Sequence, residues 1–416
     1  MNELPSTQEG RERALRVCLA RMRRAPLDFK LRVEAGELLV ALGEGARGIR
    51  VLRSCADYFT LAGFPVRALW ALSLLREHQA DDAVVERGLN LLAKHYARRS
   101  GREWGPSIYE MPMRPALRLE LDELPASLEG VMAEVDRRAT DIIRGVNFPD
   151  KLPRFPLLSE LEEEPFLTVA RAMRLRRVFD EDVLVEEGQP GKSVHIVVMG
   201  RARVVKHPPD GRVSQLAVLD EGDIFGEMAL ITESPRVATV RAEGRVDAFE
   251  LSRTVLDDLG TDANTLQSVL TRHVSDRMIN NLINLSPVFK GLSRRQRKNL
   301  MERFESRLFE EATDIITEGE PSGGLFVILD GMVKVVRKHD GELRTLNVLR
   351  EGDLMGEISL IHNSAATATC TATRRTMVLF LSRKDFDQAA RDFPGIRERI
   401  SHLGEIRLLD NIYTLA

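Results

Sequence analysis

The segment at residues 225–240 carries the residue types that bind a phosphorylated sugar. In order, it holds Phe225, Gly226, Glu227, Met228, Ala229 and Leu230, a short spacer, and then Pro235, Arg236, Val237, Ala238, Thr239 and Val240. Glycine lets a backbone approach a ligand closely, and the free N–H groups of a short helix starting at Met228 form an anion site. The Glu227 carboxylate can accept hydrogen bonds from vicinal hydroxyls, and Arg236 offers a planar cation to phosphate oxygens. The pattern predicts a site for a nucleotide with one exposed anionic phosphate.

The same segment resembles the phosphate-binding cassette of the cyclic-nucleotide-binding family. That family includes bacterial catabolite activators, kinase regulatory subunits and cyclic-nucleotide-gated channels. Its pattern F-G-E-Φ-A-L, a spacer and P-R-x-A-T-V is met at every fixed position. The resemblance implies that Glu227 holds the ribose 2′-hydroxyl, and that Arg236 and the amides near Ala229 hold the cyclic phosphate. Val237 is apolar where guanine-selective members often carry threonine, so the implied ligand is cyclic AMP. In the alternative interpretation, Glu227 and Arg236 pair with each other in an unoccupied domain.

A second copy of the cassette, at residues 355–369, lacks the cation. Its Gly356, Glu357, Ile358 and Ser359 take the places of residues 226–229. Ala365 and Ala366, however, replace the proline and the arginine. Losing a charge-assisted bidentate pair removes several kcal/mol in a desolvated site, whereas a micromolar ligand has only about 8 kcal/mol in total. We expect a structural or silent copy, with a neutral nucleoside, or a nucleotide held by His362 or another base, as the alternative.

Both cassettes lie within a longer duplication. Residues 183–205 align with 314–336 without a gap at an offset of 131, and the offset becomes 130 after a polar turn. Glu221-Gly222-Asp223 then faces Glu351-Gly352-Asp353. Each copy is a series of short Val- and Ile-rich strands separated by Gly, Pro and Asp turns, which predicts a compact antiparallel barrel or jelly roll. Helices are expected on both sides of each sheet, at about 157–176, 253–283, 292–304 and 383–409.

The remaining sequence is helical or rich in proline. Small and large residues alternate over 56–72 much as they do in tetratricopeptide repeats, where small residues let paired helices approach. We predict an α+β multidomain chain, divided into a tetratricopeptide-like helical array at 12–98, a proline-rich linker with one short helix near 126–145 at 99–155, a cyclic-nucleotide-binding domain A at 156–285, and a domain B with a degenerate cassette at 286–416.

Several function classes have no support in the sequence. The eight histidines are scattered without metal-ligand spacing, the three cysteines lie far apart, and no GxSxG, Walker or kinase signature occurs. We therefore expect no enzyme and no metal. The absence of a signal-peptide pattern and of any long apolar run predicts a cytoplasmic protein without membrane contact. A net charge of −3 and the lack of room for a further winged-helix module make DNA an unexpected partner.

These patterns predict an allosteric sensor. Cyclic AMP would enter domain A, the helices at 253–283 would reposition, and the N-terminal helices would dock a protein partner. One alternative is a ligand-independent interaction scaffold. Another is an inhibitor of the kinase-regulatory-subunit type, because Arg137-Arg138-Ala139-Thr140 has the R-R-x-T form that cyclic-AMP-dependent kinase recognises. A solvated helical face is the simpler interpretation of those four residues.

Overall fold

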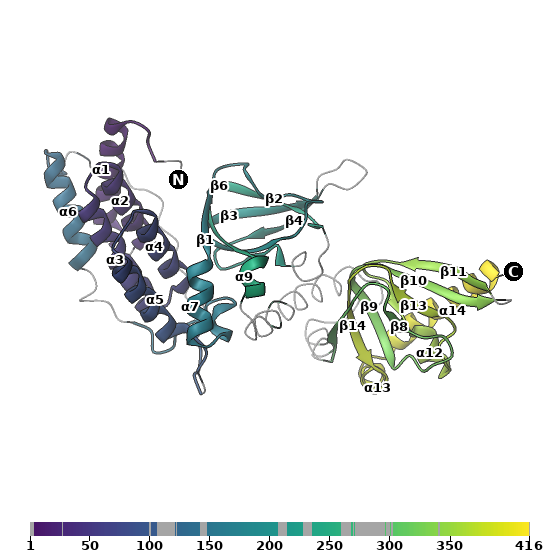
Figure 1. The fold of residues 1–416 in the computed structure, drawn as a ribbon. Helices are drawn as coiled ribbons and strands as arrows, with labels where there is room; N and C mark the ends of the chain where they lie inside the picture. The colour runs from purple at the N-terminus through teal and green to yellow at the C-terminus, as the bar shows by residue number, and fades with distance from the viewer. Residues whose placement is uncertain are drawn as a thin grey trace. The chain divides into compact units, whose positions relative to one another are not determined.

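A computed structural model describes residues 4–26, 28–99, 101–105, 121, 123–141, 148–206, 214–227, 235–258, 268, 270, 296, 300, 303–339 and 342–415. The chain divides into two compact units. The first comprises Met1–Gly226 and Arg236–Leu266, and the second comprises Glu227–Pro235 and Gln267–Ala416. The predicted order, helices followed by antiparallel sheets, is confirmed (Figure 1).

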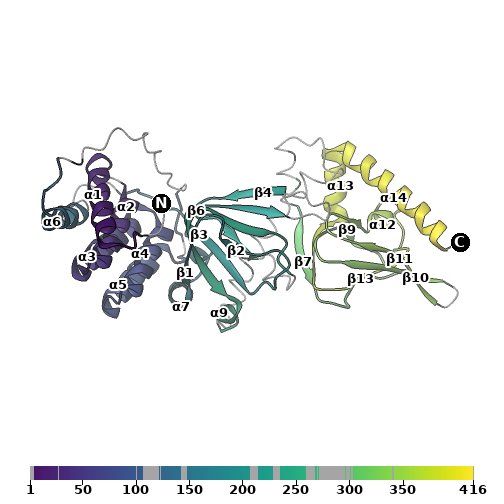
Figure 2. The same ribbon diagram turned by 90° about the horizontal axis from the view of Figure 1, so that it is seen from above.

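The first unit begins with an array of helices. These are α1 (Gln8–Arg24), α2 (Phe29–Ala41), α3 (Gly45–Ala62), α4 (Pro65–Glu77) and α5 (Asp82–Tyr96). The side chains of Thr7, Asp28 and Asp81 accept backbone N–H groups at the starts of α1, α2 and α5. Consecutive helices pack against one another, as Figures 1 and 2 show. Helix α4 is buried along most of its length, so it forms the centre of the array.

Helix α6 (Leu128–Thr140) belongs to this array although it follows the proline-rich stretch. It packs against α1 and α3. Arg23 of α1 donates to Glu134 through Nε at 2.9 Å and Nη2 at 2.7 Å, and Ser54 of α3 donates to the Ala139 carbonyl at 2.7 Å. The short helix expected near 126–145 is present, and it completes the array instead of standing alone in a linker.

An antiparallel sheet follows in the first unit, after η2 (Leu158–Glu160) and α7 (Glu163–Ala172). Its strands are β1 (Arg174–Val178), β2 (Val183–Val185), β3 (Ser193–Lys206), β4 (Ser214–Leu219), β5 (Ile224–Phe225) and β6 (Thr239–Ser252), followed by α9 (Arg253–Asp258). The order is β1-β6-β3-β4, with β2 on β6 and β5 on β3. The described strands give a jelly-roll-like sheet and do not close into a barrel. At the bulges of β3, Gly200 has φ +89, and a Cβ there would lie 2.2 Å from the Arg245 carbonyl oxygen, so only glycine fits.

The second unit repeats this construction. Its strands are β7 (Glu305–Phe309), β8 (Asp314–Ile316), β9 (Gly324–Asp330), β10 (Val333–His339), β11 (Glu342–Leu349), β12 (Leu354–Met355), β13 (Thr369–Ala372) and β14 (Thr376–Ser382). They form two four-stranded sheets, β11-β10-β13-β8 and β12-β9-β14-β7. The helices are α12 (Glu357–His362), α13 (Arg383–Asp392) and α14 (Pro394–Leu415). An apolar cluster including Phe326, Ile328 and Val378 fills the core.

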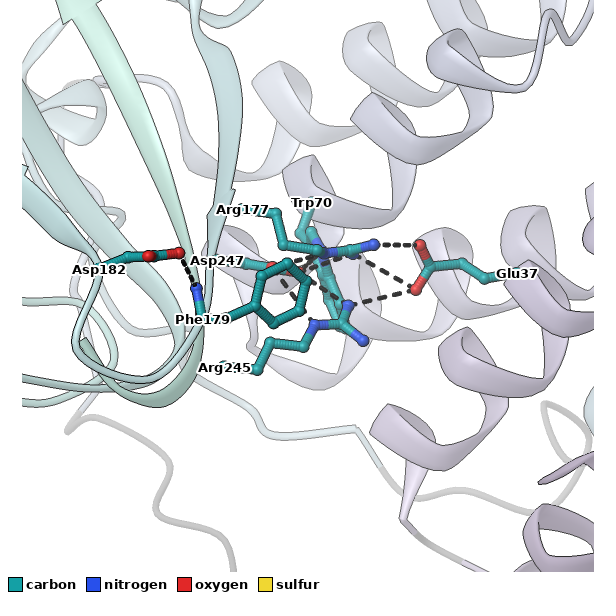
Figure 3. Close-up of polar contacts among 7 residues, drawn as sticks. All are labelled: Glu37, Trp70, Arg177, Phe179, Asp182, Arg245 and Asp247. Atoms are coloured by element: carbon teal, nitrogen blue, oxygen red, sulfur yellow. Dashed lines mark hydrogen bonds and ion pairs between the residues drawn. The ribbon is translucent and has the colours of Figure 1, made fainter. Parts of the chain in front are cut away.

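A buried network of ion pairs joins the helical array to the first sheet. Asp247 of β6 is fully buried and accepts from Arg177 Nε at 2.8 Å, from Arg245 Nη2 at 3.1 Å and from the Trp70 indole at 2.9 Å. Glu37 of α2 accepts from Arg177 at 2.8 Å and from Arg245 at 3.3 Å (Figure 3). Two carboxylates thus face two guanidiniums inside the interface, which satisfies charges that would be costly to bury alone.

The array also contacts the turn that precedes the first cassette. Arg67 of α4 donates to Glu221 through Nε at 2.5 Å and Nη2 at 2.6 Å, and Lys30 Nζ lies 3.5 Å from the same carboxylate. Glu221 precedes Gly222, whose N–H donates to the Val197 carbonyl of β3 at 2.8 Å. The helical array therefore holds the turn from which β5 and the cassette begin.

Candidate functional site

Strand β5 positions the start of the first cassette. Phe225 pairs with His195 of β3, and its ring stacks on the imidazole with 4.9 Å between ring centroids and an interplanar angle of 14°. Gly226 follows with φ +78, and a Cβ there would lie 2.7 Å from Arg236 Nη1. The positive φ favours glycine at this position, as it does at the corresponding Gly356 (φ +84), where Ala366 replaces the arginine.

Arg236 lies inside the first unit, with 7% of its surface exposed. Nη1 donates to the Gly226 carbonyl at 2.5 Å, and Nη2 donates to the Ser193 carbonyl at 2.8 Å and to Ser193 Oγ at 3.1 Å. The structure therefore brings Phe225, Gly226 and Arg236 together. A buried guanidinium with a fixed orientation can bind a phosphate at two oxygens.

The backbone at Arg236 is fixed by the turn after β2. The Arg236 N–H donates to the Gln189 carbonyl at 2.8 Å, and the Gly188 N–H donates to the Arg236 carbonyl at 2.9 Å. Thr239, which begins β6, accepts the Glu187 N–H on its hydroxyl at 3.1 Å. The cassette therefore ends on a rigid segment of the sheet.

The other predicted ligand-binding residues fall into two groups. Glu227 is buried with 2% exposed, Pro235 is exposed and Val237 is half-buried. Met228 and Ala229 lie outside the described residues, as does the helix start proposed there. Their roles remain predictions.

Two residues that the sequence did not single out contact the arginine site. Ser193 Oγ lies 3.0 Å from His195 Nε2, and both side chains are buried. Burial, together with the charge of Arg236, lowers the pKa of His195 to about 3, so the imidazole is neutral. The signal available in the sequence was the repeat itself, because Gly324 and Phe326 stand at the corresponding positions of the second copy.

The acidic residue of the second cassette is bonded to an arginine of the C-terminal helix. Glu357 begins α12 and is 3% exposed. Arg407 of α14 donates to Glu357 Oε1 at 3.1 Å and to the Leu354 carbonyl, and its Nη2 lies 3.4 Å from Asp353 Oδ1. Two carboxylates therefore face one guanidinium, which leaves this cluster negative and unfavourable to a phosphate.

A small cavity lies beside this cluster. It encloses about 90 Å³, well below the roughly 300–1,000 Å³ of most small-molecule pockets. The residues that correspond to 226–229 of the first cassette all line it, together with apolar side chains and Ala366; they are Gly356, Glu357, Ile358 and Ser359. Ser359 is buried, and its hydroxyl donates to the Ser364 carbonyl at 2.5 Å. The second copy is thus nearly filled by its own side chains.

Comparison with known proteins identifies the duplicated unit. The profile of the cyclic nucleotide-binding domain matches residues 175–262 and again residues 306–393. The chain carries two cyclic nucleotide-binding domains. The first match contains the cassette with Arg236, and the second contains the cassette with Ala366. We refer to them as domain A and domain B, in keeping with the predicted division.

Relatives of this chain include regulatory subunits of kinases and a kinase. The chain is 26% identical to a cAMP-dependent protein kinase regulatory subunit of Mycosarcoma maydis, over 58% of this chain and 48% of that protein. It is 26% identical to the cGMP-dependent protein kinase egl-4 of Caenorhabditis elegans, over 60% of this chain and 31% of that protein. The chain thus spans about half the length of this regulatory subunit and a third of the kinase.

Solved structures of such domains also match. One is the regulatory domain of Toxoplasma gondii PKA crystallised with cAMP, which is 24% identical. The match covers 60% of this chain and 92% of that chain, with a TM-score of 0.30.

The described residues contain neither a candidate metal cluster nor a helix that could span a membrane. No group of three or more His, Cys, Asp or Glu side chains in the described ranges is arranged to hold a metal ion. Every helix searched in that part of the chain is too short or too polar to cross a bilayer.

Proposed function

We propose that this chain is a cyclic nucleotide sensor whose domain A binds cyclic AMP. The observation that carries the proposal is the placement of Arg236, which is buried, hydrogen-bonded at three points and set against a glycine that leaves room for it.

In the proposed complex the ligand meets groups of complementary charge. Arg236 binds the cyclic phosphate, assisted by backbone N–H groups near Ala229. Glu227 accepts the ribose 2′-hydroxyl. Val237 lies beside the purine and favours adenine, because it offers no hydroxyl to a guanine amino group. These roles rest on the family pattern and on the burial of Glu227 and Arg236.

Domain B is proposed to be structural. Its cassette has no arginine, its acidic residue is bonded to Arg407, and its cavity of about 90 Å³ is small. Helix α14 holds these contacts in place, with Arg407 bonded to Glu357 and near Asp353. A neutral nucleoside, which needs no cation, is one alternative, and a nucleotide held by His362 or another base is the other.

Ligand binding is proposed to act on the elements around domain A. The helices expected at 253–283 would reposition, although only α9 (Arg253–Asp258) and the single residues 268 and 270 of that range are described. A ligand shifts such an equilibrium only by its preference for one conformer, about 1–3 kcal/mol in most allosteric proteins. The helical array, joined to the sheet by the Asp247 network, would carry the change to a protein partner.

The class of protein follows from the same features. We propose a cytoplasmic, non-catalytic and metal-free regulator that docks a protein partner through its N-terminal helices, without membrane or DNA contact.

Residues 137–140, which have the form of an inhibitor segment, lie at the end of α6, where Ala139 is buried and its carbonyl accepts from Ser54. This placement favours the helical-face interpretation over a kinase-type inhibitor. The tetratricopeptide-like character of the array and the four domain boundaries remain predictions.

Calorimetry with cyclic AMP tests the proposal. The full chain should bind, and Arg236→Ala should lose at least a hundredfold in affinity, because the phosphate would lose a charge-assisted pair. Arg241→Ala is the matched control. Arg241 lies on β6, which follows the cassette, but it donates to the Glu181 carbonyl, away from the cassette, so its variant should bind like the wild type.

Stabilisation by other ligands distinguishes the sensor from the ligand-independent scaffold. A thermal-shift screen should rank cyclic AMP above cyclic GMP and adenosine, and a ligand at 100 times its Kd adds about 2.7 kcal/mol to stability. If no cyclic nucleotide stabilises the wild type, the ligand-independent scaffold is the better description. Equal affinity of the wild type and Arg236→Ala would contradict the assignment of the site.

A further inference from the structure

Three side chains in domain A form a continuous hydrogen-bonded series. Arg236 Nη2 donates to Ser193 Oγ at 3.1 Å, and Ser193 Oγ lies 3.0 Å from His195 Nε2. The imidazole in turn stacks on Phe225, the first residue of the cassette. All four residues are buried, with between 1% and 7% of their surfaces exposed. The series therefore links Arg236 to Phe225 by way of two side chains of strand β3.

Domain B provides an internal comparison. At the positions of Ser193 and His195 it has Gly324 and Phe326, which stand in the same places at the start of β9. Phe326 pairs with Met355 as His195 pairs with Phe225, so the strand register is the same. The cassette's arginine is also absent, since Ala366 takes its place. The copy without the arginine thus also lacks the serine and the histidine, while its backbone has the same register.

The directions of the hydrogen bonds follow from the donors available. A guanidinium can only donate, so Ser193 Oγ accepts from Arg236. In the tautomer that the proposal below requires, the imidazole accepts the Ser193 hydroxyl hydrogen at Nε2 and carries its own hydrogen on Nδ1. His195 Nδ1 is buried without a hydrogen-bond partner among the described residues. Leaving a buried polar atom unpaired is costly, which is the reason a phenylalanine would normally be preferred at such a position.

We propose that Ser193 and His195 are positioning residues that hold the Arg236 guanidinium in the orientation that binds the phosphate. This inference rests on the proposed function of domain A. The histidine acts only through the serine: it takes the hydroxyl hydrogen and so turns the oxygen lone pairs of Ser193 toward Arg236. Domain B, which has no arginine to position, keeps neither residue.

A double-mutant cycle measured with cyclic AMP tests this order of action. Ser193→Ala should weaken binding about tenfold, and His195→Phe should weaken it by a smaller factor, because the serine can still accept from the arginine. The double variant should bind no more weakly than Ser193→Ala alone, since the histidine has no route of its own to Arg236. Ser193→Thr keeps the hydroxyl and should restore most of the affinity. Ser252→Ala, which alters the strand partner of Ser193, is the matched control and should bind like the wild type.

Nitrogen NMR of histidine-labelled, ligand-free protein provides a readout that packing alone would not change. His195, assigned by the signal missing in His195→Phe, should be neutral with its hydrogen on Nδ1 and its Nε2 accepting a hydrogen bond. Ser193→Ala should move the Nε2 resonance toward that of a free acceptor. Arg236→Ala should also move it, because the serine hydroxyl would no longer be held by the guanidinium.

The outcomes separate this inference from the proposed function. If Arg236→Ala abolishes cyclic AMP binding but Ser193→Ala and His195→Phe bind normally, the site is correct and the positioning role is wrong. Additive losses in the double variant also overturn the role. If the wild type does not bind cyclic AMP, the proposed function fails, and the NMR response of His195 to Ser193→Ala and Arg236→Ala still decides whether the series exists: a response supports it and no response refutes it.

Discussion

The indole N–H of Trp70 in α4 donates to Asp247 of β6 across 2.9 Å, and neither side chain is exposed by more than 1%. This bond lies at the centre of the interface between the helical array and the sheet of domain A. Burial disfavours ionisation of Asp247, but hydrogen bonds and the charges of Arg177 and Arg245 outweigh it, so the pKa of this carboxyl lies below its usual value. The array and the sheet of domain A therefore belong to one packed unit.

Removing the charge of Asp247 should destabilise the unit strongly. Asp247→Asn leaves Arg177 and Arg245 sharing only Glu37, and breaking a buried ion pair in this way costs about 3–5 kcal/mol. Chemical denaturation of the full chain measures the effect. Glu86→Gln is the control, because its pair with Arg171 is about half exposed and should contribute only about 0.2–1 kcal/mol. Equal effects of the two substitutions would show that the network adds little to the packing of the helical array on the sheet.

Helix α6 should be held to the array in a pH-dependent way. The hydrogen bond from Arg23, with a second from Arg138, lowers the pKa of Glu134 to about 2. A lowered folded-state pKa stabilises the protein above the unfolded pKa of about 4.3, and this contribution is lost as the pH falls through 2. The Tm of Glu134→Gln should therefore lie below that of the wild type at pH 6, and the gap should close toward pH 2. A gap that stays constant with pH would contradict the assigned partner charges.

The contact between Arg67 and Glu221 should stiffen the turn before the cassette. Arg67→Gln removes the bidentate pair, so the Gly222 N–H, bonded to Val197, should exchange with solvent about tenfold faster. Hydrogen–deuterium exchange with peptide resolution over 214–227 measures this. Arg76→Gln on the same helix is the control, because Arg76 donates to the Arg171 and Met173 carbonyls away from the turn. Unchanged exchange in Arg67→Gln would show that the contact with the helical array does not stabilise the turn before the cassette.

The sequence was informative where the signal is local or repeated. The offset of the duplication predicted both sheet domains, and the spacing from Gly226 to Arg236 located the part of the cassette that the structure describes. Alternation of Val and Ile marks strands because side chains in a strand point to opposite faces with a period of two. The pattern did not distinguish a closed barrel from open jelly-roll-like sheets, since closure depends on how edge strands meet.

Contacts between distant positions could not be predicted in this way. Glu37 and Arg245 are 208 positions apart, and Arg407 reaches Glu357 from a helix 50 positions later. Charged residues are common on helix surfaces, so neither partner differs locally from a solvated one. Ser193 and His195 were also missed, because they lie on β3, more than 30 positions before the cassette arginine, and their contact with it depends on the fold.

Domain B should not bind cyclic AMP even when domain A is disabled. In Arg236→Ala protein the remaining cassette offers Glu357 and Asp353 against one guanidinium, so the phosphate would enter a negative site without its own cation. No thermal shift is expected with cyclic AMP or cyclic GMP at millimolar concentration. Arg407→Ala in the same background tests whether helix α14 blocks the site: it should lower the stability of domain B, because Glu357 would be buried unpaired, without creating affinity for either nucleotide. Saturable stabilisation of either variant by cyclic AMP, with an affinity different from that of the wild type, would contradict the structural assignment of domain B.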